Sequence, residues 1–291
     1  MAVSEKMSNQ STSLFQSAIK KVLNDKLSLT ALIIVVIYFV IALLTFLGVI
    51  ASDWGKEVAA SYAEPSGSLL FGADIFGRSV VLKVIKATET AVMLGIVVSL
   101  ISTIIGTTLG VLAGYFGGVV DDIITWFLTT FAAIPSIMLL ISIAFILGKG
   151  TVTVFLALGL TSWLGLCRIV RAEVMKHRDR EYVQAANAIG ASNSRKIVKH
   201  ILPNISHLLI INFTQTFDSA IKAEVILSFL GLSVVGRPSW GGMIDDAKLE
   251  LSRGVWWQLA AATLAMFVIV LAFNILGDAL RDALDPKLKG K

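Results

Sequence analysis

Three charged side chains, Asp218, Lys222 and Glu224, interrupt an otherwise apolar stretch of the chain. Asp218 and Lys222 are four residues apart, so on a helix they would share a face and could form an ion pair. A charge inside a membrane is costly and usually faces a cavity or a partner group. These residues are therefore candidates for lining a path through which a solute passes. The alternative is a self-neutralised pair packed between helices.

Residue types that carry enzymatic chemistry do not form a recognisable set. His177, His200 and His207 are the three histidines, and they form no H-E-x-x-H metal motif. No G-x-S-x-G nucleophile motif occurs in the sequence. The GKGT at 148–151 lacks the upstream glycine of a phosphate-binding loop, because Ile143 stands there. We expect no catalytic residue, metal site or cofactor in this chain, and the sequence disfavours an intramembrane enzyme.

The composition indicates an α-helical membrane protein. Hydrophobic residues make up 56% of the 291 residues and charged residues only 15%, with a mean hydropathy of +0.81. Soluble domains carry about 25% charged residues. The apolar runs reach the ~20 residues that a spanning helix needs, which is too long for barrel strands. The net charge of +5 follows the expected membrane topology, so it does not indicate a nucleic-acid partner.

Six apolar runs predict six transmembrane helices, at 29–50, 90–114, 123–147, 152–169, 206–232 and 256–276. Six spans put both termini on one side. The segments on that side hold sixteen Lys and Arg residues and those opposite hold eight, so the termini are predicted to be cytoplasmic. The expected organisation is a tail at 1–28, the first span, an extracytoplasmic loop at 51–89, a core at 90–286 with a cytoplasmic segment at 172–205, and a tail at 287–291.

Small residues and a proline predict how these spans are shaped. Gly106, Gly110 and Gly114 recur at four-residue spacing, which lets two helix backbones approach closely. Pro135 lies near the middle of the third span and should kink it. In the extracytoplasmic loop, glycines around two charged residues predict turns, at Gly72, Asp74, Gly77 and Arg78.

The cytoplasmic segment 172–205 has more local order than a linker needs. Tyr182, Ala185, Ala186 and Ile189 fall at helical spacing and predict a narrow, small-residue face. Gly190 is suited to a left-handed helix cap.

A second short helix is expected beyond this glycine. Ser192 can cap its start, and Pro203 is expected to end it and to hold Leu202 extended. Two short helices at an angle predict docking to another protein, whereas an interfacial helix lying on lipid is the alternative.

This segment resembles a known motif. QAANAIGASNSRKIVKHILP at 184–203 is similar to the EAA motif of ABC-importer permeases, with Gln184 in place of its Glu and His200 in place of its Ile. Both departures resemble the dipeptide/oligopeptide/nickel group and its C-type subunit. Other stretches resemble that group too: LFGADIFGRSV (70–80), LAGYFGG (112–118), AEVILSFLGL (223–232), PSWGGM (238–243) and LAFNILGDALRDALDP (271–286).

The resemblance implies a type I importer permease in the bacterial inner membrane. It implies a second homologous permease subunit, two cytoplasmic ATPase subunits that bind ATP and Mg²⁺, and an extracytoplasmic substrate-binding protein. The residues implied in ATPase coupling are Tyr182, Gln184, Ala185, Ala186, Gly190, His200, Leu202 and Pro203. The expected substrates are peptides, with nickel or another chelate or small solute as the alternative. A stand-alone secondary transporter or channel is the alternative from another class, although no internal repeat is evident.

Overall fold

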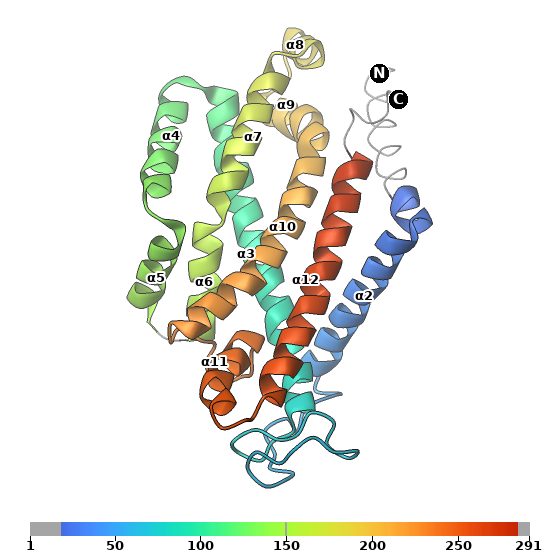
Figure 1. The fold of residues 1–291 in the computed structure, drawn as a ribbon. Helices are drawn as coiled ribbons and strands as arrows, with labels where there is room; N and C mark the ends of the chain where they lie inside the picture. Colours follow the sequence, from blue (N-terminus) through green and yellow to red (C-terminus); the bar gives the residue numbers. More distant parts are fainter. Residues whose placement is uncertain (1–18, 149, 285–291) are drawn as a thin grey trace.

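The computed structural model describes residues 19–148 and 150–284, and it forms an all-helical bundle (Figure 1). The long helices are α2 (Lys26–Phe46), α3 (Val80–Phe116), α10 (Leu202–Phe229) and α12 (Trp257–Leu284). The other helices are α4 (Gly118–Ala133), α5 (Ser136–Leu147), α6 (Thr151–Thr161), α7 (Trp163–Arg178), α8 (Glu181–Ala188), α9 (Asn193–Lys196), the π-helical turn η1 (Ile197–Ile201) and α11 (Trp240–Leu251).

Four stretches are long and apolar enough to cross a membrane, and the bent pair α4–α5 would make a fifth. The four are α2, α3, the combined stretch Thr151–Arg178 and α12. The predicted fifth span at 206–232 corresponds to α10, which does not meet this test of apolarity although it has 28 residues. Within the described part of the chain, α10 is packed between α3 and α12 in the bundle (Figure 1). A helix with this environment exposes less surface to lipid, so it tolerates more polar residues.

Several predicted boundaries are wrong. The second helix begins at Val80 rather than near residue 90, because Ser79 caps it by accepting a hydrogen bond from the Leu82 backbone N–H. With 37 residues and a rise of ~1.5 Å each, α3 is longer than the ~30 Å hydrocarbon core and extends beyond it. Residues 233–255, predicted as a polar loop, contain α11, which Ser239 caps in the same way. The tail 287–291 and most of the tail 1–28 lie outside the described residues.

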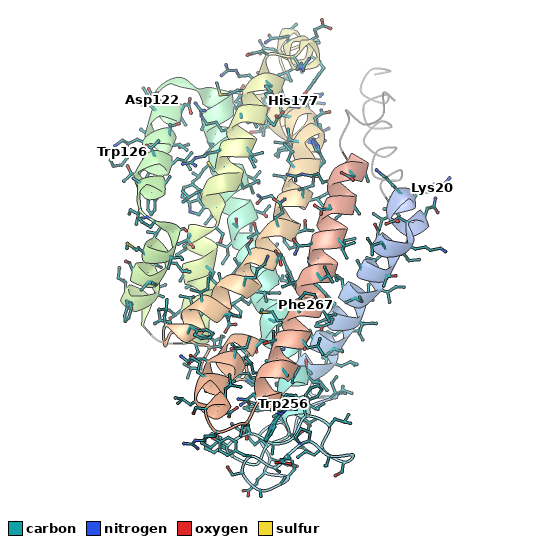
Figure 2. The ribbon with its side chains drawn as sticks, in the orientation of Figure 1. Lys20, Asp122, Trp126, His177, Trp256 and Phe267 are labelled. Atoms are coloured by element: carbon teal, nitrogen blue, oxygen red, sulfur yellow. The ribbon has the colours of Figure 1, made fainter. Side chains whose placement is uncertain are left out.

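The kink predicted at Pro135 is a complete break. Helices α4 and α5 meet there at 96°, with Ile134 and Pro135 extended between them. Proline removes a backbone donor and forces the residue before it out of the helical region. Most side chains of both helices are exposed in this single chain, as Trp126 at the outer edge of the bundle illustrates (Figure 2).

The two ends of the bundle differ in construction. Helices α8 and α9 project from one end, where Lys20 and the end of α12 also lie (Figures 1 and 2). The opposite end holds α11 and the irregular segment 47–79 (Figure 1).

Candidate functional site

Helix α8 ends in the geometry predicted for Gly190. Its φ angle is +76°, a conformation that glycine adopts without steric cost. Its N–H donates to the Asn187 carbonyl, and the N–H of Ala191 donates to the Ala186 carbonyl, which is the hydrogen-bond pattern of a Schellman cap. Ser192 then accepts from the Arg195 N–H at the start of α9, as predicted. The chain direction therefore changes sharply between the two short helices.

The face predicted for α8 is divided between the interior and the solvent. Ala186 is buried against its own chain together with Val183, a residue that the prediction overlooked. Tyr182 is half-buried, whereas Gln184, Ala185 and Ile189 are exposed, the last with 85% of its surface. The surface that α8 offers to another molecule is thus formed by Gln184, Ala185, Ala188 and Ile189, and we call it the outer face of α8. The spacing of small residues shows which of them share a face of the helix. It does not show which of them are buried against the rest of the chain and which are exposed.

Polar contacts fix α8 to the spans. The Tyr182 hydroxyl lies 2.5 Å from His177 Nδ1 on α7, and its ring packs against the half-buried His200. Burial raises the pKa of Tyr182, with nearby Arg180 acting in the opposite direction, so its hydroxyl remains protonated at neutral pH. The side chain of Val183 joins an apolar cluster with residues of α3, α7 and α10. Because this cluster includes residues of α3, α7 and α10, a force on α8 can be passed through it to all three helices.

Helix α9 has its own connections. Lys196 donates to Asn187 Oδ1 of α8 at 2.9 Å, and the Tyr115 hydroxyl at the end of α3 donates to Asn193 Oδ1 at 2.9 Å. Arg178 also donates to the carbonyls of Gly114 and Tyr115. The two short helices are therefore attached to the corner between α3 and α4.

The prediction that Pro203 ends a helix is wrong. Leu202 is helical rather than extended, and Pro203 lies at the start of α10, directly after the turn η1. The turn η1 makes the connection with the i→i+5 pattern, in which the Leu202 N–H donates to the Ile197 carbonyl. The chain thus runs from α9 through η1 into α10 without a stop.

The glycine spacing on α3 has the predicted consequence. A Cβ atom built on Gly106, Gly110 or Gly114 would lie 3.0, 2.8 or 2.6 Å from a backbone carbonyl oxygen of α7. The two helices are therefore in backbone contact along this stripe. Near its end, Arg171 of α7 donates two hydrogen bonds to Asp121 of α4, at 2.5 and 2.6 Å. No local pattern in the sequence indicates this pair, because its members are fifty positions apart.

The intramembrane charges of α10 have different surroundings. Asp218 and Lys222 form the predicted ion pair, with 2.6 Å between Oδ2 and Nζ, and about half of the Lys222 side chain is exposed. Asp218 Oδ1 is buried with no hydrogen-bond partner among the described residues.

Glu224 is buried inside the chain instead of lining an open passage. It accepts hydrogen bonds from Ser228, from Ser239 and from the backbone N–H of Gly241. A Cβ on Gly241 would collide with this carboxylate. Glu224 therefore anchors the start of α11 to α10, so the prediction that it lines the path is not supported by its position.

At the opposite end of the bundle, the predicted turn residues build an ionic network. Gly72 and Gly77 have φ angles of +60° and +68°. Fully buried Asp74 accepts from the backbone N–H groups of Phe76 and Arg78 and from the Arg78 side chain. Burial alone would raise the pKa of Asp74, but the hydrogen bonds from Arg78 and the charge of Lys83 outweigh it and hold the pKa below its usual value.

Lys83 extends this network to the last helices. Its Nζ lies 3.1 Å from Asp74 Oδ2 and 3.0 Å from Gln258 Oε1 of α12, and Gln258 donates to Glu250 of α11 at 3.0 Å. Burial raises the pKa of Glu250 in spite of the nearby Lys83 charge. The network connects the 47–79 segment with α3, α11 and α12. Its distant members, Gln258 and Glu250, could not be recognised from sequence spacing.

These observations define a multi-pass helical membrane protein. At one end, helices α8 and α9 are held by hydrogen bonds and apolar contacts to the long helices, and at the other end an ionic network around Asp74 and Lys83 joins the 47–79 segment to α3, α11 and α12. Residues 106–290 match the family model described as the binding-protein-dependent transport system inner membrane component, and the chain belongs to this family. The resemblance to ABC-importer permeases is thereby confirmed.

Known relatives cover most of the chain. It is 32% identical over 286 residues to the oligopeptide transport system permease protein OppC of Bacillus subtilis, covering 98% of this chain and 93% of the relative. It is 33% identical over 280 residues to the dipeptide transport system permease protein DppC of the same organism, covering 96% and 88%. A di/tripeptide transport system permease protein DppC of Pseudomonas aeruginosa is 37% identical over 221 residues, covering 76% and 73%.

Proposed function

We propose that this chain is a permease subunit of an ATP-driven importer of peptides, and that it forms half of the translocation pathway. The observation that carries the proposal is the outer face of α8, which is exposed and includes the short side chains of Ala185 and Ala188. Helix α8 is connected to α3, α7 and α10 through the apolar cluster that contains Val183. Short side chains let a partner helix or groove approach the α8 backbone closely. Movement of the partner would then displace α3, α7 and α10 together.

The proposed topology has six spans with both termini in the cytoplasm of a bacterium, in its inner membrane. Helix α10 serves as the fifth span, and the broken pair α4–α5 as the third. The placement of Lys20, α8 and the end of α12 at the same end of the bundle supports this arrangement. The excess of Lys and Arg in the segments predicted on the side of the termini supports the assignment of that end as cytoplasmic.

The proposed partners follow from the family and from the sequence. A second homologous permease would complete the pathway as a heterodimer, and two ATPase subunits would bind ATP and Mg²⁺ and dock at α8. An extracytoplasmic binding protein would deliver the substrate to the end that holds α11. Closure of the ATPases would shift a two-state equilibrium between the two access states of the permease pair.

Peptides are proposed because the relatives named above carry oligopeptide, dipeptide and di/tripeptide transport in their names. Another relative, a permease protein of Shigella dysenteriae that is 34% identical over 227 residues, is named for glutathione transport. Nickel or another chelate is the alternative substrate class within the family. Uptake measured with a dipeptide, a pentapeptide and a nickel chelate would separate these possibilities.

The test of coupling uses three substitutions on and beside α8 in the assembled transporter. Ala185→Glu places a charge on the outer face, and we expect ATP hydrolysis without uptake. Gly190→Glu should do the same, while Gly190→Ala controls for the backbone strain of its positive φ angle. Lys20→Glu, exposed at the same end of the bundle, should leave coupling unchanged.

The structure also changes the choice of variant. Ala186→Glu would bury a charge against the chain's own core, so it would lower the amount of folded protein as well as the coupling. Normal coupling in Ala185→Glu and Gly190→Glu would contradict the docking role of α8. Uptake by the chain in liposomes without any ATPase subunit would instead favour a stand-alone transporter.

A further inference from the structure

An apolar groove of about 330 Å³ opens on the outer surface of the bundle, away from α8. Its walls come from α2, α3 and α12, and the segment around Leu70 and Phe71 closes one end. The lining is aliphatic and aromatic, and the single hydroxyl in it, that of Tyr38, donates to the Ala265 carbonyl at 2.8 Å. The groove therefore offers no unpaired side-chain hydrogen-bonding group among its described residues, and an apolar guest fits it best.

The groove opens on the surface of the bundle and not into its interior. Leu70 at its closed end is 70% exposed and Leu264 on its wall is 56% exposed. All three helices that line it are apolar enough to span a membrane. Their outward surfaces are the part of the molecule that meets acyl chains, so the groove is continuous with the lipid interface.

The position of the groove along α12 corresponds to the acyl region of one leaflet. Trp256, 53% exposed just before α12, marks the headgroup level, where tryptophan is enriched. Ala261 and Val268 both line the groove. At a rise of ~1.5 Å per residue they lie roughly 8 and 18 Å further along α12. The hydrocarbon half of one leaflet is about 15 Å thick, so the groove runs along the acyl region of the leaflet on the α11 side.

We propose that this groove is a binding site for one acyl chain of a membrane phospholipid in that leaflet. Water does not fill an apolar void, and an empty groove would forfeit the dispersion contacts of its walls. In a bilayer the acyl chain is the abundant apolar group of the right shape. Because lipid and protein side chains are equally apolar, the lipid is held by packing rather than by the hydrophobic effect.

The site is independent of the proposed transport function. A bound chain would pack against Tyr38 of α2 and against the residues of α3 and α12 that line the groove.

Photo-crosslinking tests the proposal directly. The full-length chain is reconstituted in liposomes of phosphatidylethanolamine and phosphatidylglycerol with a trace of phosphatidylethanolamine bearing a diazirine in one acyl chain. After illumination, the labelled peptides are mapped by mass spectrometry. We expect labelling of groove residues such as Val84, Ile85 and Val268 to exceed, several-fold, that of exposed apolar residues elsewhere on the same helices.

Variants that fill the groove provide the second arm. Ala265→Phe, or Val268→Phe if the first variant does not fold, should reduce this labelling several-fold. Thr263→Phe adds a ring at a comparable depth on α12 but outside the groove, so the labelling should stay unchanged. Equal labelling inside and outside the groove, or labelling unaffected by filling it, would overturn the proposal. So would its disappearance on assembly with a second permease subunit, which would mean that a protein helix occupies the groove.

Discussion

Replacing Gly110 by alanine probes the backbone contact between α3 and α7. The new Cβ would lie 2.8 Å from the Cys167 carbonyl oxygen and 2.8 Å from Val170 Cβ. Both neighbours belong to α7, and one of them is backbone, so no rotamer change relieves the collision. The two helices would have to move apart.

The expected cost follows from two opposing effects. Overpacking a close contact costs about 1–3 kcal/mol. Alanine is favoured over glycine in a helix by about 0.5–1 kcal/mol, which offsets part of that cost. We therefore expect Gly110→Ala to lower the free energy of unfolding by about 1 kcal/mol, and by at most about 2.5 kcal/mol.

Gly165→Ala is the matched control. Gly165 lies on α7, is exposed, and has no atom within 4 Å of its would-be Cβ. The same chemical change should therefore raise the free energy of unfolding by about 0.5–1 kcal/mol, since only the helix preference remains.

The assay is unfolding of the purified chain in mixed micelles, followed by helical circular dichroism during titration with a denaturing detergent. A lower free energy of unfolding for Gly110→Ala together with a higher one for Gly165→Ala would support the backbone contact. Stabilisation by Gly110→Ala of the same size as by Gly165→Ala would refute it, because the helices could not then be as close as 2.8 Å between these atoms. In the assembled transporter, Gly110→Ala should also weaken coupling, since α7 leads directly into α8.

Three further changes test other contacts. The pKa of Asp74 lies below its unfolded value, so its contribution to stability is complete at pH 5–8 and is lost below about pH 4. Asp74→Asn should remove that acid-dependent part of the unfolding curve; an unchanged curve would mean that the interactions of Asp74 with Arg78 and Lys83 do not cause it. Glu224→Leu should destabilise the chain by about 1–3 kcal/mol for each buried donor left unpaired, and Glu224→Gln by less; limited proteolysis within 233–255 measures this. Equal protection in both variants would show that α11 is held by other contacts. Arg171→Lys keeps the charge but loses the two-fold hydrogen bond to Asp121, so thermal stability should fall while folding is retained; a melting temperature equal to that of the unchanged chain would contradict the bidentate geometry.

The sequence alone was informative about local features. Hydropathy identified the membrane class and the approximate positions of the long helices, although α3, α7 and α12 extend well beyond the predicted spans. Gly190 and Ser192 were predictable as caps because capping depends on a few neighbouring backbone groups. Glycine spacing predicted a close helix contact, although not that α7 would be the partner.

Errors arose where a local signal has two structural outcomes. Pro203 can follow a helix or begin one, and only the packing of α10 against α3 and α12 selects the second. Residues 233–255 read as a loop because α11 is short and is held by Glu224 and Gln258 from other helices. Ala186 and Ala185 are adjacent small residues on one predicted face, and only the position of the apolar cluster decides that the first is buried.

Composition and apolar run length thus determined that this is a helical membrane protein, and local capping signals predicted a structured segment at 172–205. The resemblance of that segment to the EAA motif indicated a permease. Those properties depend on neighbouring residues and on the thickness of the bilayer. The tertiary structure decided which side of α8 is free, that Glu224 holds α11, and that Asp74 reaches Gln258 through Lys83. These are contacts between residues far apart in the chain, and their free energies depend on distances that no local pattern encodes.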